Sequence, residues 1–329
     1  MSLKEIGKKI LESNKIGITF HVSPDGDAMG SALALLNGLR YLNKDAYIIS
    51  KDIIGENLEF LPLGKEVDGT IRCPEEDTDL VVSLDCGNFE RVSADLSSYK
   101  GSLINVDHHI SNEQYGNLNY VDTNAASTGE IVFELIKVLG IKFNDKTEIS
   151  KKIGTCIYTT LVTDTGSFRH SNVTERTHRI ASELIAVGVN NTNIYKNLFD
   201  NRAMKKLNLM GYAFENAKLF LNGKVIVVGL SEEILKKYDC EQEDTSDIIG
   251  NLLSVKNVEV AVLLKETSEG TKASLRSKND FDVREVAEAF GGGGHIKASG
   301  VMQKGVFLED AKNNILNKIE SELKNGRRN

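Results

Sequence analysis

The chain has 329 residues, 40% hydrophobic and 26% charged, which is typical of a globular protein long enough for two domains. Its formal net charge of −7 disfavours a protein that grips long nucleic acid non-specifically, because such proteins carry a basic stripe. The sequence contains no run of about 18 apolar residues, so we expect no membrane-spanning helix and no membrane partner. The four cysteines lack the spacing of a metal knuckle, so we expect reduced thiols in a cytoplasmic protein.

Apolar runs typical of strands alternate with helical patterns in the first half of the chain. Strands are predicted at 16–22, 45–50, 79–85 and 102–108, and a helix is predicted at 28–42. This alternation predicts an α/β fold with a doubly wound, mostly parallel sheet that is covered on both faces. From about residue 127 to residue 200 the pattern becomes helical.

A new strand-rich pattern begins after residues 201–216, which are predicted to form a connecting helix. A hairpin is expected around Asn222 and Gly223, followed by strands at 258–266 and 271–278 and by helices near 282–289 and from about 307. We therefore predict a first domain over 1–200, a connecting helix over 201–216, and a smaller α/β domain with a mixed sheet over 217–329.

Acidic residues and histidines follow three of the predicted strands. The carboxyl ends of parallel strands meet at one rim of a doubly wound sheet, where ligands bind. A single aspartate there is often a helix cap, and a single histidine is often structural, but the joint pattern favours a functional site. Its members are His21 after the first strand, Asp25 and Asp27 on the following turn, Asp85 after the third strand, and Asp107, His108 and His109 after the fourth.

Several carboxylates in one cleft repel each other, and divalent cations remove that repulsion. Carboxylates mixed with imidazoles suit Mn²⁺, with Mg²⁺, Co²⁺ or Fe²⁺ as competitors. Asp164 follows a long apolar helix and supplies a fourth acid, so that four carboxylates would balance two ions. Two ions roughly 3.5–4 Å apart form the clamp that is used in phosphoryl transfer.

Four segments resemble, in order, the motifs of the DHH phosphoesterase superfamily: "HVSPDGDAMGS", "SLDCGNFER", "NVDHHISN" and "TDTGSF". A fifth segment, "GGGGHIKASG", resembles the glycine-rich motif of the DHH-associated domain. Together they cover nearly the whole chain, and its length and short connection are similar to the NrnA-like branch. The resemblance implies an active site in a cleft between the two domains.

The resemblance also implies a role for each residue of the first domain. One metal would be held by His21, Asp25 and Asp85, and the other by Asp27, Asp85, His108 and Asp164. Asp85 would bridge both ions. His109 would face the scissile phosphate, and Asp107 would orient an imidazole.

Two segments of the second domain are candidates for substrate binding. In a strand over 271–278, Lys272, Ser274, Arg276 and Lys278 would share one face, although a solvated edge strand would show the same pattern. Residues 291–294 are four consecutive glycines, which are unfavourable inside a helix or strand. Such a run lets backbone N–H groups approach an anion, although a glycine-rich turn without a ligand is the alternative interpretation. The resemblance implies that these segments bind the substrate's nucleotide or terminal phosphate through Arg276, Ser277, Lys278, Gly291, Gly292, Gly293, Gly294 and His295.

The activity that the resemblance implies is hydrolysis of short oligoribonucleotides to 5′-mononucleotides, together with removal of the 3′-phosphate of 3′-phosphoadenosine 5′-phosphate. A phosphodiesterase acting on linear or cyclic dinucleotides is the alternative within the superfamily, and a non-catalytic nucleotide sensor is the non-enzymatic one. The expected partners are two divalent cations and a small nucleotide, with no long nucleic acid. The sequence is compatible with a homodimer.

Overall fold

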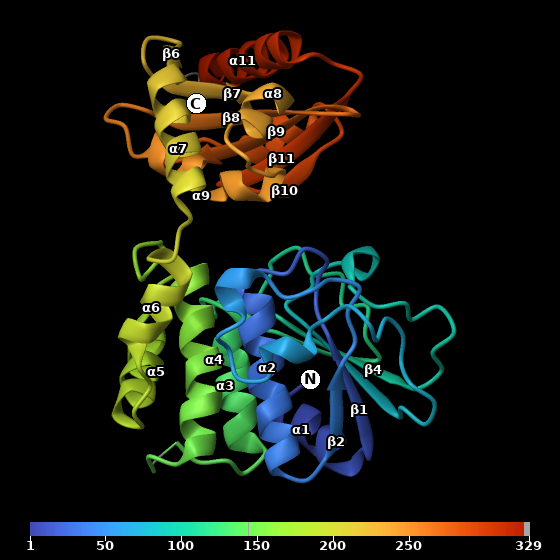
Figure 1. The fold of residues 1–329 in the computed structure, drawn as a ribbon. Helices are drawn as coiled ribbons and strands as arrows, with labels where there is room; N and C mark the ends of the chain where they lie inside the picture. The colour runs from blue at the N-terminus through green and yellow to red at the C-terminus, as the bar shows by residue number, and fades with distance from the viewer. Residues whose placement is uncertain (144, 326–329) are drawn as a thin grey trace. The chain divides into compact units, whose positions relative to one another are not determined.

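The computed structural model describes residues 1–143 and 145–325, which fold as two compact units, Met1–Asn201 and Arg202–Asn329. Each unit has its own sheet and its own hydrophobic cores, and each is described here by itself (Figure 1). Within the described residues, no helix has the length and apolar character needed to cross a membrane.

The first unit contains the predicted parallel sheet. Its strand order is β2-β1-β3-β4-β5, and all neighbours run parallel. The chain therefore reverses its direction of winding between β1 and β3, and this switch point is where open α/β sheets bind ligands. The strands are β1 (Lys15–Thr19), β2 (Asp45–Ile48), β3 (Leu80–Leu84), β4 (Ser102–Asp107) and β5 (Leu118–Val121).

Helices gather on one side of this sheet (Figure 1). Their apolar side chains form one large core with the facing side chains of the strands. The helices are α1 (Leu3–Glu12), α2 (Gly26–Tyr41), α3 (Thr128–Val138), α4 (Glu148–Asp164), α5 (Glu175–Ala186) and α6 (Asn191–Phe199).

Loops cover the other face of the sheet. The connections from β2 to β3 and from β3 to β4 contain only the 3-10 turns η1 (Glu56–Leu58), η2 (Gly64–Glu66) and η3 (Phe89–Arg91). Ile71, Val92 and Ala94 from these connections pack against Tyr47 and Val81 of the sheet. The sheet is thus covered on both faces, but the second layer is built without α-helices.

Glycines allow α2 and α4 to pack closely. A Cβ at Gly30 would lie 2.6 Å from the carbonyl oxygen of Cys156 and 2.5 Å from Cγ2 of Thr160. A Cβ at Gly26 would likewise lie 2.4 Å from Cγ2 of Thr163. This close approach brings the first turn of α2 beside the last turn of α4.

The second unit is a mixed six-stranded sheet in the order β10-β11-β9-β8-β7-β6. Only β7 and β8 pair in parallel, and helices cover both faces over two separate cores. The elements are α7 (Met204–Asn216), β6 (Lys218–Phe220), β7 (Val225–Leu230), α8 (Glu232–Lys237), η4 (Gln242–Thr245), α9 (Ser246–Leu253), β8 (Val260–Thr267), β9 (Gly270–Ser277), α10 (Val283–Glu288), β10 (Gly293–His295), β11 (Ala298–Lys304) and α11 (Leu308–Asn325).

Helix α7 occupies most of the segment that we predicted as a connection. Its Leu209 and Ala213 are buried in a core of the second unit. The helix therefore packs as a part of that unit, in addition to following the first one in the chain.

Two sequence interpretations of the second unit differ from the structure. Strand β9 lies between β8 and β11, so it is an interior strand and not a solvated edge. Gly293 and Gly294 belong to the short strand β10, although we expected the glycine run to avoid strands. Gly294 has φ +139°, and a Cβ there would lie 2.6 Å from the carbonyl oxygen of Ala298, so the pairing of β10 with β11 itself requires glycine.

Candidate metal centre

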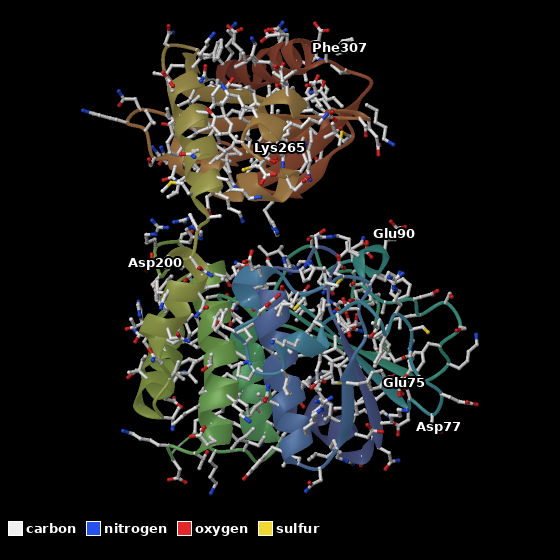
Figure 2. All side chains as sticks on the ribbon, viewed as in Figure 1. Glu75, Asp77, Glu90, Asp200, Lys265 and Phe307 are labelled. Atoms are coloured by element: carbon white, nitrogen blue, oxygen red, sulfur yellow. The ribbon has the colours of Figure 1, made fainter. Side chains whose placement is uncertain are left out.

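The loops that follow β1, β3 and β4 bring the predicted acids and histidines of the first unit together. Figure 2 shows Glu90, which follows β3, at the upper edge of this unit, whereas Glu75 and Asp77, which precede β3, lie lower down. The predicted cluster thus forms at the carboxyl ends of the strands, beside the switch point between β1 and β3.

His21 forms one half of the cluster. Its Nδ1 donates to the carbonyl oxygen of Val22 at 2.9 Å, so Nε2 is the ring atom that faces the acids and would offer a lone pair to a cation once its proton is lost. Nε2 lies 3.8 Å from Oδ1 of Asp25 and 3.6 Å from Oδ2 of Asp85. These distances exceed a hydrogen bond and suit donors sharing one ion, since ligands about 2.1 Å from a metal stand at most about 4.2 Å apart.

His108 forms the other half in the same way. Its Nδ1 bonds to the carbonyl oxygen of Ala125 at 3.2 Å. Its Nε2 lies 3.8 Å from Oδ2 of Asp27, 3.7 Å from Oδ1 of Asp85 and 3.7 Å from Oδ2 of Asp164. The two oxygens of Asp85 therefore face two different histidines.

The buried carboxylate of Asp27 is held by the start of α3. Its oxygens accept the backbone N–H groups of Thr128 at 2.7 Å and Gly129 at 3.0 Å, and the hydroxyl of Ser31 at 3.1 Å. The hydroxyl of Thr128 also donates to Oδ1 of Asp85 at 3.0 Å. The first N–H groups of a helix favour negative charge, so α3 stabilises both acids.

Asp25 caps α2, because its Oδ1 accepts the backbone N–H groups of Asp27 at 3.0 Å and Ala28 at 3.1 Å. Asp164 is the last residue of α4, which packs closely against α2. The packing of these two helices thus sets the distance between acids that are more than a hundred residues apart in the sequence.

His109 points to Asp107 and lies near Asp85. Its Nδ1 bonds to Oδ1 of Asp107 at 2.7 Å and lies 3.6 Å from Oδ1 of Asp85. Asp85, His108 and His109 also form a group whose donor atoms could share a cation. The geometry therefore places His109 beside the cluster, with Asp107 in the orienting position that we predicted for it.

The charges of the cluster perturb one another. Burial raises the pKa of Asp27 well above its usual range, and Asp85, Asp164 and Asp25 add to this. Burial and the neighbouring acids also raise the pKa of Asp164, to about 7, against the opposing effect of His108. Burial alone lowers the pKa of His21, but Asp25 and Asp85 outweigh it and raise that pKa to about 11. In the metal-free protein, these raised pKa values favour the protonated forms of Asp27, Asp164 and His21.

The donor set fits divalent cations. Carboxylate oxygens combined with imidazole nitrogens suit Mn²⁺, Mg²⁺, Co²⁺ or Fe²⁺. Within the described residues, one group that could hold a cation contains His21, Asp25 and Asp85, and another contains Asp27, His108 and Asp164. The first group has the same members as one predicted set, and the second has those of the other set except Asp85, whose Oδ1 lies 3.7 Å from Nε2 of His108. The assignment of ligands stays a prediction.

Comparison with known proteins agrees with the motifs. Residues 15–161 match the DHH family, N-terminal domain, and residues 222–325 match the DHHA1 domain. The chain is 33% identical over 309 residues to the bifunctional oligoribonuclease and PAP phosphatase NrnA of Thermus thermophilus, covering 94% of this chain and 90% of that protein. The chain belongs to the DHH family, in its NrnA-like branch.

Solved structures of DHH relatives share this fold. An exopolyphosphatase-related protein from Bacteroides fragilis is 30% identical and superposes with a TM-score of 0.89, covering 97% of this chain and 95% of that chain. RecJ from Thermus thermophilus, crystallised in complex with Mn²⁺, is 15% identical with a TM-score of 0.59, covering 97% of this chain and 54% of that chain. DHH neighbours are therefore known with bound metal.

The predicted substrate residues of the second unit are only partly brought together. His295 pairs with Ala298, and Ala298 pairs with Arg276, so the two basic side chains stand on one face with a small residue between them. Ser277 lies on the opposite face, where its hydroxyl donates to the carbonyl oxygen of Phe281. Lys278 lies beyond the strand and does not continue the face of Arg276, and its Nζ donates to the carbonyl oxygen of Val255.

The glycines of this unit differ in setting. Gly291, with φ +78°, lies in the turn that ends α10, where its N–H donates to the carbonyl oxygen of Glu288 at 3.0 Å. A Cβ at Gly292 would lie 2.3 Å from the carbonyl oxygen of Gly300, whereas nothing would contact one at Gly293. The close approach of two backbones therefore accounts for Gly292 and Gly294 without any ligand.

Proposed function

We propose that this chain is a two-metal phosphoesterase that hydrolyses short oligoribonucleotides to 5′-mononucleotides and dephosphorylates 3′-phosphoadenosine 5′-phosphate to AMP. The observation that carries the proposal is the position of Asp85, whose two carboxylate oxygens each face a separate histidine and acid set. The name of the Thermus thermophilus relative supports this choice of substrates.

The proposed ligands are His21, Asp25 and Asp85 for one ion, and Asp27, Asp85, His108 and Asp164 for the other. Mn²⁺ is the cation that we favour for both, with Mg²⁺ or Co²⁺ as substitutes. Two bound cations supply an activated water and neutralise the charge of the leaving oxygen. The protein fixes the donors beforehand, because backbone groups hold the imidazoles of His21 and His108 and the carboxylate of Asp27.

His109 is proposed to contact the scissile phosphate. A protonated imidazole donates a charge-assisted hydrogen bond to a phosphoryl oxygen and stabilises its developing charge. Burial lowers the pKa of His109, but Asp107 and Asp85 outweigh that effect and raise it to about 9, which keeps the ring protonated at neutral pH. Asp107 is proposed to orient the ring through its hydrogen bond to Nδ1.

Arg276 and His295 are proposed to bind the terminal phosphate or nucleotide of the substrate. They stand in one row across three strands, with the small residue Ala298 between them. Arginine suits bidentate phosphate contacts. We also propose that the segments beside Arg276 and His295 form part of the substrate-binding region. These segments contain Ser277, Lys278 and the glycines at 291–294.

A short substrate agrees with the net charge of −7, which disfavours long nucleic acid. Cys73, Cys86, Cys156 and Cys240 are free thiols, as expected in a reducing compartment, so we propose that the protein acts in the cytoplasm. A homodimer stays a prediction.

A product time-course on a substrate panel tests the proposed function. The panel contains 2- to 5-mers of RNA and DNA, a 24-mer, 3′-phosphoadenosine 5′-phosphate, cyclic dinucleotides and pyrophosphate, each with Mn²⁺ and with Mg²⁺. We expect fast release of mononucleotides from the shortest RNAs and of AMP from the bisphosphate. Exclusive cleavage of cyclic dinucleotides would support the alternative phosphodiesterase, and no turnover on any substrate would support the sensor.

The substitution Arg276→Ala tests the role of the second unit. An arginine on a terminal phosphate contributes about 1.5–3 kcal/mol of binding, so the KM for dinucleotides should rise roughly 10- to 100-fold. Hydrolysis of bis-p-nitrophenyl phosphate, which has no second phosphate, should change much less. Lys304→Ala, at an exposed lysine at the other end of the same sheet region, is the control. Equal losses on both substrates would place Arg276 at the reaction centre instead.

A further inference from the structure

Asp85 has an unfavourable backbone conformation. Its φ of +52° lies in the left-handed region, which crowds the Cβ of any residue other than glycine. Such a conformation persists only where its surroundings enforce it. The groups that hold the backbone around Asp85 therefore act, together with the hydroxyl of Thr128 on its side chain, to set where its carboxylate points.

The carbonyl oxygen of Cys86, one residue after Asp85, accepts two hydrogen bonds at 3.0 Å. One comes from Nδ2 of Asn105 and the other from the hydroxyl of Tyr115. Tyr115 also accepts from Nδ2 of Asn105 at 3.1 Å and bonds to the hydroxyl of Ser83 at 2.7 Å. Both amide hydrogens of Asn105 and the one hydroxyl hydrogen of Tyr115 are thus used at this point.

The same network continues to His109. Nδ2 of Asn112 donates to Oδ1 of Asn105 at 2.8 Å and to Oδ2 of Asp107 at 2.6 Å. Asp107 in turn bonds to Nδ1 of His109 at 2.7 Å. An unbroken chain of hydrogen bonds therefore joins the carbonyl group of Cys86 to the imidazole of His109.

The members of this network come from the ends of two strands and one loop. Asn105 is fully buried in β4, and Ser83 is fully buried in β3. Asn112 and Tyr115 lie on the loop from β4 to β5, which is fastened to the loop after β3 by the bond from the N–H of Glu113 to the carbonyl oxygen of Gly87, at 2.8 Å. The network is thus built from side chains of two neighbouring strands and the loop that follows them.

We infer that Tyr115, Asn105 and Asn112 are positioning residues that fix the carboxylate of Asp85 and the imidazole of His109 relative to each other. Tyr115 and Asn105 hold the left-handed turn at Asp85, and Asn112 passes that geometry on to Asp107 and His109. The inference rests on the proposed function for its catalytic meaning, but its effect on cation binding is measurable without any substrate. Partners of metal ligands change metal affinity or activity about 10- to 100-fold when they are lost.

The substitution Tyr115→Phe removes one hydroxyl and keeps the ring, so it is the variant of choice. Tyr99→Phe is the matched control, because Tyr99 packs against the same small core and its hydroxyl donates to the carbonyl oxygen of Ser102, at 3.2 Å, away from the network. Mn²⁺ affinity is measured by titration calorimetry on the full chain, and unfolding is followed by circular dichroism in the metal-free state.

We expect Tyr115→Phe to weaken Mn²⁺ binding roughly tenfold or more and to lower kcat without raising KM. Tyr99→Phe should show unchanged Mn²⁺ affinity, even where the two variants lose similar thermal stability. Unchanged Mn²⁺ affinity in Tyr115→Phe, or an equal loss in both variants, would overturn the inference.

The substitution Asn112→Ser isolates the second half of the network. It breaks the bonds to Asp107 and Asn105 and the longer one to the carbonyl oxygen of Cys86, at 3.5 Å, and leaves those of Tyr115 to Cys86 and Ser83. We therefore expect kcat to fall at least tenfold while Mn²⁺ affinity falls less than in Tyr115→Phe. An unchanged kcat would overturn the role of Asn112. If the wild-type chain binds Mn²⁺ but cleaves nothing in the panel, the proposed function fails, and the calorimetric comparison of Tyr115→Phe with Tyr99→Phe still decides the inference.

Discussion

At the scale of single residues, neighbouring histidines have different surroundings. Nε2 of His108 faces three carboxylates at 3.7–3.8 Å, whereas Nδ1 of His109 is hydrogen-bonded to Asp107 at 2.7 Å. The side chains of successive residues point in different directions. His108 can therefore bind a cation while His109 contacts a phosphate. The pair therefore offers a direct test of how the work at the site is divided.

We predict that His109→Ala keeps both cations and loses turnover, whereas His108→Ala loses one cation. The reason is that only His108 has the three-carboxylate surroundings of a ligand. Metal analysis after dialysis measures stoichiometry, and a dinucleotide assay measures rate. Asp85→Asn is the reference, because both sites lose a ligand there, and its rate should fall on the order of 10³-fold or more. The same metal loss in both histidine variants would refute this division.

Proton release gives a second prediction at this scale. The pKa of Asp164 is raised to about 7 in the metal-free protein and that of His21 to about 11, so both groups carry protons that a cation must displace. Mn²⁺ affinity should therefore increase as the pH rises from 6 to 8. Titration calorimetry in buffers with different ionisation enthalpies counts the protons released.

In Asp164→Asn the carboxyl group no longer releases a proton when Mn²⁺ binds. The increase of Mn²⁺ affinity with pH should therefore become shallower between pH 6 and pH 8. His21 should still release its proton throughout this range, because its pKa lies well above it. An affinity independent of pH in the wild-type chain would contradict the assigned ligands.

The sequence pattern predicted the position of some site residues but not of others. His21, Asp85 and His108 follow apolar strands, so their strand-end positions alone predicted a shared rim. Tyr115 lies in an irregular loop, where no periodicity indicates which way a hydroxyl points. Asn105 did carry a signal, since a polar residue inside an apolar strand needs a buried partner, but the sequence does not identify that partner.

At the scale of elements, the contact between α2 and α4 sets the distance between Asp27 and Asp164. Glycine permits that contact, because at Gly30 a Cβ would lie 2.6 Å from the carbonyl oxygen of Cys156. The sequence showed the small residues of this helix but not the partner that requires them. A substitution there therefore tests how packing controls the site.

We predict that Gly30→Ala destabilises the chain by about 1–3 kcal/mol, the usual cost of overpacking, and also weakens Mn²⁺ binding. Gly211→Ala is the matched control, because Gly211 also lies inside a helix but no atom lies within 4 Å of its added Cβ. The control should gain about 0.4–1 kcal/mol from the reduced freedom of the unfolded chain. Urea unfolding measures both changes, and a stabilised Gly30→Ala would contradict the packing argument.

Sequence analysis did not predict β5, β10, β11, α8 or α9, and two of these have weak patterns. Strand β5 is only half-buried, so its residues do not form an apolar run. Strand β10 consists of two glycines and a histidine, and only its pairing with β11 makes it a strand. By contrast, the fully buried β3 and the long α4 were found, because burial imposes a continuous apolar pattern on the sequence.

At the scale of the whole molecule, the cation site belongs to one unit. All proposed ligands lie within Met1–Asn201, and the second unit has two cores of its own. The two units therefore have separate sources of stability. Cations that bind only the folded first unit stabilise that unit by mass action.

We predict that Mn²⁺ at about 100 times its Kd stabilises the first unit by about 2.7 kcal/mol for each bound ion, which raises its Tm by roughly 11–22 °C when both proposed sites are filled. Scanning calorimetry measures the transitions, and hydrogen exchange assigns each to a unit. The transition of the second unit should not move, and Asp85→Asn should abolish the shift of the first. An equal shift of both transitions would show that the units unfold together.

The distribution of the ligands along the chain has a consequence for biosynthesis. Asp25 and Asp27 are translated early, but their helix completes its packing only when α4, which ends at Asp164, has emerged from the ribosome. A nascent chain that lacks α4 contains Asp25 and Asp27 but not Asp164, which completes the proposed set of ligands. The proposed cation site is therefore complete only after α4 has been synthesised, and we expect chains truncated before Asp164 to bind Mn²⁺ weakly.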